Sequence, residues 1–262
     1  MTTTSIRRAG VLALVAAAAT TTLTGCAGVI GAKMTYNDTE KGKITDIVLD
    51  GGAGDVLITT GQVTETTITR IIQRSSNPGE SYRLTGSTLT LDASCGMRCT
   101  VSYQIKTPPG VTVRGRLGSG DIRLDGVAAA DVQLTSGDLT VANATGPVQV
   151  RATSGDINVV DSKGTVSTQA TSGDTKIINP GGAVTAKVSS GDLSVVLAQP
   201  NSVTAQASSG DVNVAVPEGN YKLVTHAGSG DVDVHGMESD STSKNVIDVK
   251  VGSGDVNVAS GV

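Results

Sequence analysis

The tripeptide Ser-Gly-Asp recurs eight times from residue 119 onward in this 262-residue chain. Successive copies are 17, 18, 18, 18, 19, 20 and 24 residues apart, and a degenerate copy, Gly-Ala-Gly-Asp, ends upstream at Asp55. A near-constant period of this length indicates stacked structural units that bury their apolar sides against their neighbours. The acidic residues of the eight copies are Asp121, Asp138, Asp156, Asp174, Asp192, Asp211, Asp231 and Asp255.

Apolar and polar residues alternate on both sides of each Ser-Gly-Asp. In the copy that begins at Ser154, Val148 and Ala152 precede the tripeptide, and Ile157 and Val159 follow it. This alternation is typical of strands with one buried face. Each unit therefore reads as strand, Ser-Gly-Asp corner, strand and variable corner, with glycine allowing the sharp bend. The alternation also predicts that the serine side chain points inward and the aspartate side chain outward.

Units of about 18 residues with two short strands predict an all-β fold, a single elongated β-solenoid whose coils hydrogen-bond at about 4.8 Å spacing. The composition agrees, because the chain has no Phe, no Trp and only four Tyr. A compact globular core normally uses large aromatic side chains, whereas Val and Ala can fill a thin one. The alternative fold is a β-sandwich of hairpins.

The N-terminal residues indicate export. Arg7 and Arg8 precede a short apolar run, and residues 1–25 are predicted to be a signal peptide. The sequence Leu-Thr-Gly-Cys at residues 23–26 resembles the lipobox of bacterial lipoproteins. That resemblance implies a diacylglycerol on the thiol of Cys26 and anchoring to the outer face of the cell membrane. The alternative is an ordinary secretory signal that contains a cysteine.

The mature chain divides into three predicted parts. Residues 26–42 are the lipidated cysteine and a flexible tether, residues 43–112 an irregular β section that caps the solenoid, and residues 113–262 the regular repeats. A cap is expected because an open sheet edge invites pairing with other chains. The chain ends four residues after Val258 without a recognisable cap. The C-terminal edge is therefore a candidate surface for self-association.

The repeat also carries a family resemblance. The stretch YQIKTPPGVTVRGRLGSGDIRLDG, followed by recurring strand, Ser-Gly-Asp and strand, resembles the bacterial β-strand-repeat family known as "putative adhesins". The resemblance covers roughly residues 45–262. It implies the solenoid fold, but it brings no catalytic residues, because none are established for that family.

The eight aspartates would form a ladder along one edge of a regular stack. Carboxylates about 5 Å apart repel by roughly 1 kcal/mol in water and by roughly 3–4 kcal/mol at an effective dielectric of 20. Hydrogen bonds from backbone N–H groups of the corner would offset this repulsion. The alternative is a row of calcium ions, but calcium takes six to eight oxygen ligands, and each unit supplies one aspartate. We therefore predict no cofactor and keep calcium as the alternative.

Few other residues carry chemistry. Cys95 and Cys99 are predicted to form a disulfide, as is usual in exported proteins. His226 and His235 are distant in sequence and lack a ligand cluster, so no metal site is expected. The four tyrosines look too scattered for glycan stacking; they are Tyr36, Tyr82, Tyr103 and Tyr221.

The uniform repeat favours a scaffold over an enzyme, since catalysis needs one pocket with unlike partners. The net charge of −4 argues against nucleic acid as a partner. The first hypothesis is a lipid-anchored, non-catalytic, adhesin-like binding or structural module whose partner is an envelope protein or polymer. The second is an envelope stress or regulatory protein that self-associates through the C-terminal edge. A glycan-active β-helix enzyme is the third.

Overall fold

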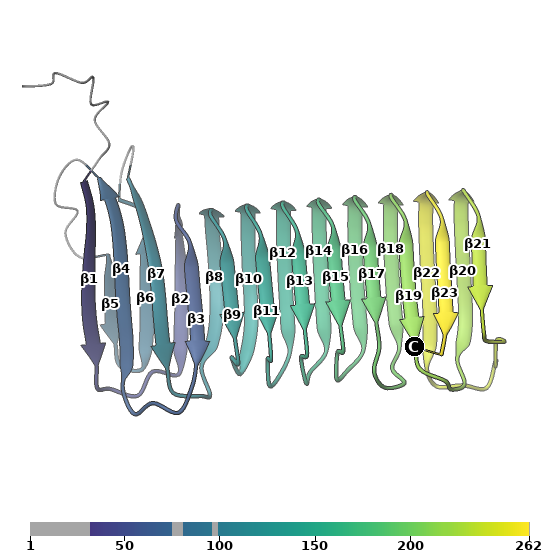
Figure 1. Cartoon of the computed structure of the whole chain (residues 1–262), viewed down its shortest axis with the longest axis horizontal. Helices are drawn as coiled ribbons and strands as arrows, with labels where there is room; N and C mark the ends of the chain where they lie inside the picture. Colours follow the sequence, from purple (N-terminus) through teal and green to yellow (C-terminus); the bar gives the residue numbers. More distant parts are fainter. Residues whose placement is uncertain (1–31, 75–80, 96–98, 262) are drawn as a thin grey trace, which may run out of the picture. The chain divides into compact units, whose positions relative to one another are not determined.

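The computed structural model (Figure 1) describes residues 32–74, 81–95 and 99–261. Their regular structure consists of 23 β-strands in two sheets, of 12 and 11 strands. The prediction of an all-β solenoid is confirmed. The predicted signal peptide and Cys26 lie outside the described residues. In the described part of the chain, no helix is long and apolar enough to cross a membrane.

Six regular coils form the middle of the solenoid. Each has a longer strand in the 11-stranded sheet, a Ser-Gly-Asp corner and a shorter strand in the 12-stranded sheet, and neighbouring coils pair in parallel. In Figure 1 the corners align along the upper edge and the variable loops along the lower edge. The strands are β8 (Thr112–Ser119), β9 (Ile122–Asp125), β10 (Ala129–Ser136), β11 (Leu139–Ala142), β12 (Val148–Ser154), β13 (Ile157–Val160), β14 (Val166–Ser172), β15 (Thr175–Ile178), β16 (Val184–Ser190), β17 (Leu193–Val196), β18 (Val203–Ser209) and β19 (Val212–Val216).

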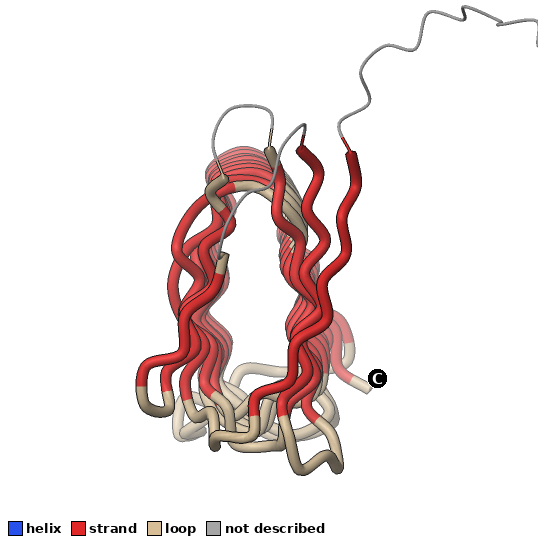
Figure 2. Tube along the Cα trace, turned by 90° about the vertical axis from the view of Figure 1, so that its left-hand side faces the viewer, coloured by secondary structure: helices blue, strands red, loops and turns tan. Residues whose placement is uncertain are grey.

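The core lies between the inward faces of the two sheets, which face each other across a narrow interior (Figure 2). Val148, Ala152, Ile157 and Val159 are all buried, as their alternation predicts. Small and branched side chains suffice because each coil contributes only a thin slice of core. Thr175, the one polar residue directly after a repeat aspartate, is buried in the same row.

The predicted orientation of the corner serine is wrong. Ala152 is buried, but Thr153 and Ser154 are both exposed, as is Asp156. The inward phase therefore changes before the serine and not at the glycine. The strand ladder shows the reason, because Ala152 pairs with Ala170 and Ser154 with Ser172 while the residue between them is skipped.

At the N-terminal end, the order of strands in space differs from their order in the chain. The coil β2–β3 lies between the regular coil β8–β9 and the coil β6–β7. Beyond them, β4 runs antiparallel to β7, β1 antiparallel to β4, and β5 antiparallel to β6. These strands are β1 (Ala32–Glu40), β2 (Asp46–Gly52), β3 (Val56–Thr60), β4 (Thr66–Arg74), β5 (Tyr82–Thr85), β6 (Thr88–Ala93) and β7 (Thr100–Thr107).

The expected tether over residues 26–42 is partly wrong, because residues 32–40 form β1. This strand pairs with β4 along its whole length, from Ala32 opposite Arg74 to Glu40 opposite Thr66. Half-buried Met34 and Tyr36 alternate with exposed neighbours. The segment is mostly polar, so the alternation of apolar and polar residues that predicts a strand is weak in its sequence.

The C-terminal end also reverses the chain order. The last coil, β22 (Val246–Ser253) and β23 (Val256–Ser260), lies between the coil β18–β19 and the coil β20 (Lys222–Ser229) and β21 (Val232–His235). The expectation that the chain end forms the open edge is therefore wrong, because β23 is paired on both sides. The edge belongs to β20 and β21. The 24-residue step between Asp231 and Asp255 leaves enough chain for the last coil to return inside.

Candidate functional site

The repeat aspartates form a continuous hydrogen-bonded ladder along the corners. In each coil the carboxylate Oδ1 accepts the backbone N–H of the aspartate in the next coil, at 2.8–3.1 Å. The ladder begins at Asp55, whose own N–H donates to Ser102 Oγ, and it ends at Asp231. In spatial order it runs Asp55, Asp121, Asp138, Asp156, Asp174, Asp192, Asp211, Asp255 and Asp231.

These bonds connect neighbouring coils, whereas the sequence suggested bonds within one corner. A hydrogen bond from a neutral N–H to a carboxylate is stronger than a neutral pair, so each bond offsets part of the repulsion along the row. The aspartates of the corners therefore link each coil to the next. Among the described residues, no group of three or more His, Cys, Asp or Glu side chains is placed to hold a metal ion.

Glycine is required at the corner for two reasons. Gly155 has a φ of +115°, a conformation that residues with a side chain rarely adopt. A Cβ at this position would also lie 2.0 Å from the carbonyl oxygen of Gly137 in the preceding coil. The corner thus combines a bend with close stacking of backbone on backbone.

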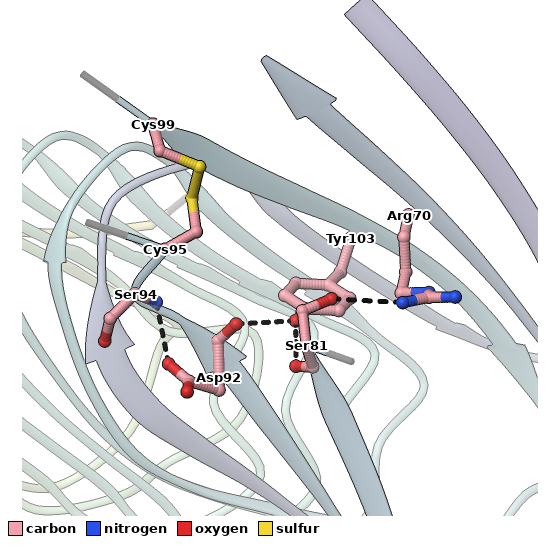
Figure 3. Close-up of a disulfide and its surroundings, with 7 residues drawn as sticks. All are labelled: Arg70, Ser81, Asp92, Ser94, Cys95, Cys99 and Tyr103. Carbon is pink, nitrogen blue, oxygen red and sulfur yellow. Dashed lines mark hydrogen bonds between the residues drawn. A yellow bond between two sulfur atoms is a disulfide. The ribbon is translucent and has the colours of Figure 1, made fainter. Parts of the chain in front are cut away.

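The N-terminal section carries a disulfide between Cys95 and Cys99 (Figure 3). Their Cα atoms are 5.4 Å apart. The side chain of Cys99 is buried, and Cys95 packs against the core from a half-buried position. The bridge joins the end of β6 to the start of β7, beside the strands that close this end of the solenoid.

Sequence reasoning missed an arginine cluster at the same end. The Arg70 guanidinium lies 5.0 Å from the ring centres of both Tyr36 and Tyr82. It also forms an ion pair with Asp38 at 2.9 Å. In addition, it donates to Ser81 Oγ at 3.3 Å (Figure 3). Only 11% of the arginine side chain is exposed. The residues come from β1, β4 and the start of β5, which are distant in the chain, so their spacing in the sequence does not predict the cluster.

Tyr103 shares the contact residue Ser81 with Arg70. Its hydroxyl donates to the backbone carbonyl of Asp92 at 2.7 Å and contacts the carbonyl of Ser81. Burial raises the pKa of Tyr103 to about 12. Burial and a hydrogen bond to Glu40 likewise raise the pKa of Tyr82 to about 12. Three of the four tyrosines, which look scattered in the sequence, therefore gather at one end, and Tyr82 and Tyr103 remain neutral donors near pH 7.

The opposite end, formed by β20 and β21, exposes apolar side chains. Val224, Val232 and Val234 are 38%, 41% and 37% exposed, and they are the exposed large hydrophobic residues of the described chain. Val256 and Val258, which pair with Val232 and Val234, are 1% and 0% exposed. The difference arises because no further coil in the described structure covers β21.

The loop after β21 covers only part of this end. Ser239 bridges to Tyr221, its Oγ accepts the N–H of Leu223 at 3.0 Å, and the N–H of Asp240 donates to the carbonyl of Tyr221 at 2.8 Å. These contacts protect the start of β20 and leave β21 open. His226 and His235 are both exposed, on β20 and at the end of β21, in different sheets.

Comparison with known proteins gives a family and a set of distant folds. A family model described as Toastrack DUF4097 matches residues 33–183 and again residues 166–259, which confirms the family expected from the repeat. No curated protein matches the chain.

Three solved structures illustrate the distant folds. A putative adhesin from Bacteroides fragilis is 14% identical with a TM-score of 0.45, covering 89% of this chain and 100% of its own. One from Parabacteroides merdae is 12% identical with a TM-score of 0.40, covering 88% and 97%. A putative cell adhesion protein from Clostridium sporogenes is 14% identical with a TM-score of 0.31, covering 87% and 100%.

Proposed function

We propose that this chain, which belongs to the Toastrack family DUF4097, is a lipid-anchored module of the cell envelope that binds a partner and catalyses no reaction. The observation that carries the proposal is a uniform stack of coils that follows, in the sequence, an N-terminal Leu-Thr-Gly-Cys. From Asp55 to Asp255, each corner carboxylate bonds to the backbone of the neighbouring coil and so serves the stack itself. Exposed sheet faces are left as the surface for a partner.

Lipid labelling tests the anchor directly. Cells that express the full chain are grown with radiolabelled palmitate and then fractionated. We expect label and membrane association for the wild type and neither for Cys26→Ala. The double variant Cys95→Ser with Cys99→Ser is the matched control, and it should keep the label. A wild-type chain without label, or a Cys26→Ala chain that keeps it, overturns the anchor.

The exposed valines of the end coil support a second candidate function, self-association. A two-fold axis at this end would pair β20 and β21 of two copies antiparallel. Such an isologous contact closes on itself and leaves no further edge. It would cover Val232 and Val234 in both copies at once. The edge in question is β20–β21 and not the chain terminus.

Cysteine cross-linking in membranes tests this contact. We expect His235→Cys, at the end of the open strand, to give a covalent dimer on mild oxidation. Asn143→Cys, at an exposed corner of a regular coil, should remain monomeric. Adding Val232→Lys and Val234→Lys to His235→Cys should remove the dimer. Equal cross-linking at both positions, or none at residue 235, overturns self-association through this edge.

A further inference from the structure

We propose that the outer face of the 11-stranded sheet binds a linear anionic polysaccharide along a row of alternating cationic and amide side chains. The inference rests on the first proposed function and deepens it, because it gives the chemistry of the envelope partner. It is carried by strand register, side-chain exposure and a groove on the same face.

The row occupies one register position in successive strands. Four cations, Arg116, Arg151, Lys187 and Lys250, alternate with three amides, Gln133, Gln169 and Gln206. All seven are exposed except Gln206, which is half-buried. His226 ends the row on β20, and Asp50 on β2 marks its other limit. Between these limits the row contains no acidic residue, although the chain has more acidic than basic residues, 24 against 20.

The reversed order of the last coils maintains the alternation. Along the chain His226 follows Gln206, but in space Lys250 stands next to Gln206 because β22 lies between β18 and β20. The cations therefore recur on every second strand, from β8 to β22 (Figure 1). With strands about 4.8 Å apart, the positive charges are roughly 10 Å apart along a line of roughly 30 Å.

A groove runs beside the cations at the C-terminal half of the row. Its volume is about 460 Å³, and its lining includes Lys187, Gln206, Lys250 and His226. Two residues after the row, each of these strands carries only serine or glycine, namely Ser189, Ser208, Gly252 and Gly228. Long side chains stand beside small ones, so the sheet surface is hollowed along the solenoid axis. No Phe, Tyr or Trp is among the residues that line the groove, and its charged and amide side chains favour recognition through charge and hydrogen bonds.

Existing ion pairs on this face are weak enough to be displaced. Arg151 lies 3.8 Å from Asp131, and Lys250 lies 3.2 Å from Asp248, and all four side chains are partly or largely exposed. Exposed pairs of this kind contribute roughly 0–1 kcal/mol. Arg116 and Lys187 form no ion pair with any described residue. A ligand that meets several cations together gains from each contact at little extra entropic cost.

The spacing favours a polysaccharide over nucleic acid. Duplex DNA carries one negative charge per roughly 1.7 Å of axis, which is far denser than one cation per roughly 10 Å. The acidic corners of the same coils would repel the surplus charge. A polymer with a carboxylate on every second sugar offers isolated charges separated by hydroxyl groups, which the intervening glutamines can bind.

Binding to hyaluronate, which has one carboxylate on every second sugar, tests the proposal. The full chain is purified in detergent, and its binding is measured at low and at physiological ionic strength. We expect salt-sensitive binding by the wild type, weakened roughly ten-fold in Arg151→Gln with Lys187→Gln. The matched control, Arg123→Gln with Lys176→Gln, removes one Arg and one Lys from the exposed face of the other sheet and should bind like the wild type.

Each other outcome overturns the proposal. Equal weakening in both double variants would mean that net charge and not the row governs binding. Equal competition by neutral dextran or by duplex DNA would contradict the spacing argument. No binding by a wild-type chain that carries lipid on Cys26 would reject this ligand while leaving the anchored module intact. Matching thermal melts of the variants show that the fold is retained.

Discussion

The two ends of the solenoid are finished differently. At the N-terminal end, antiparallel strands β1, β4 and β5 extend beyond the coils, and Arg70 is held between two tyrosine rings. At the C-terminal end, β20 and β21 leave three valines exposed. Both ends are built on the same coil, so the coil does not determine how the stack terminates. One end is fastened by polar contacts, and the other offers an edge that invites pairing.

The ends nevertheless share one arrangement. The first coil in the chain, β2–β3, and the last, β22–β23, both lie one position inside the end of the stack. Each is therefore paired on both sides. Pairing on both sides keeps the backbone N–H and C=O groups of both coils away from an open sheet edge. The outermost coils, β6–β7 and β20–β21, instead lie within the chain, so each has further strands before it and after it in the sequence.

The largest expected effect concerns the closed end. Arg70→Ala should lower the free energy of unfolding by about 3 kcal/mol or more, because it removes two ring contacts and leaves Asp38 without its ion-pair partner. Urea denaturation followed by circular dichroism measures the loss. The exposed Arg83 on β5 provides the control, and Arg83→Ala should change stability by less than about 0.5 kcal/mol. Similar losses in both variants would show that the cluster does not fasten this end.

A valine comparison separates interior coils from the open end. Val214 on β19 and Val234 on β21 both pair in register with Val258, from opposite sides. Val214→Ala should cost about 2 kcal/mol, because it leaves a cavity in a filled core. Val234→Ala should cost less than about 1 kcal/mol, because the side chain is already 37% exposed. Thermal melts compare them, and equal costs would mean that another molecule covers the end coil.

The smallest expected effect concerns the aspartate ladder. Asp156→Ala should cost about 1 kcal/mol, because the N–H of Asp174 loses its acceptor. Asp231 stands last in the ladder and accepts no such bond from a described residue, so Asp231→Ala should leave the unfolding midpoint unchanged. The two midpoints in urea check this difference. A ladder that contributes nothing would give the same result at both positions.

Much of this architecture is determined by the sequence itself. Alternation around Ser154 predicts which of Val148, Ala152, Ile157 and Val159 face the core, and the recurring glycine predicts the corner. These features are local, because a strand's period of two and a glycine's backbone freedom act within a few residues. The solenoid follows once eight such units repeat. The predicted direction of the corner serine is wrong, because the inward phase already changes at Thr153, two residues before the glycine.

Only the tertiary structure decided which coils are neighbours. Parallel pairing depends on the edges of the strands, and these edges are nearly equivalent from coil to coil. The repeat alone is therefore compatible with more than one stacking order. Connections of different length let β2–β3 and β22–β23 take inner positions, and those positions in turn place Lys250 beside Gln206. Arg70, Tyr36 and Tyr82 meet for the same reason. Local periodicity specifies the coil, whereas contacts between residues distant in the chain specify its ends and its surfaces.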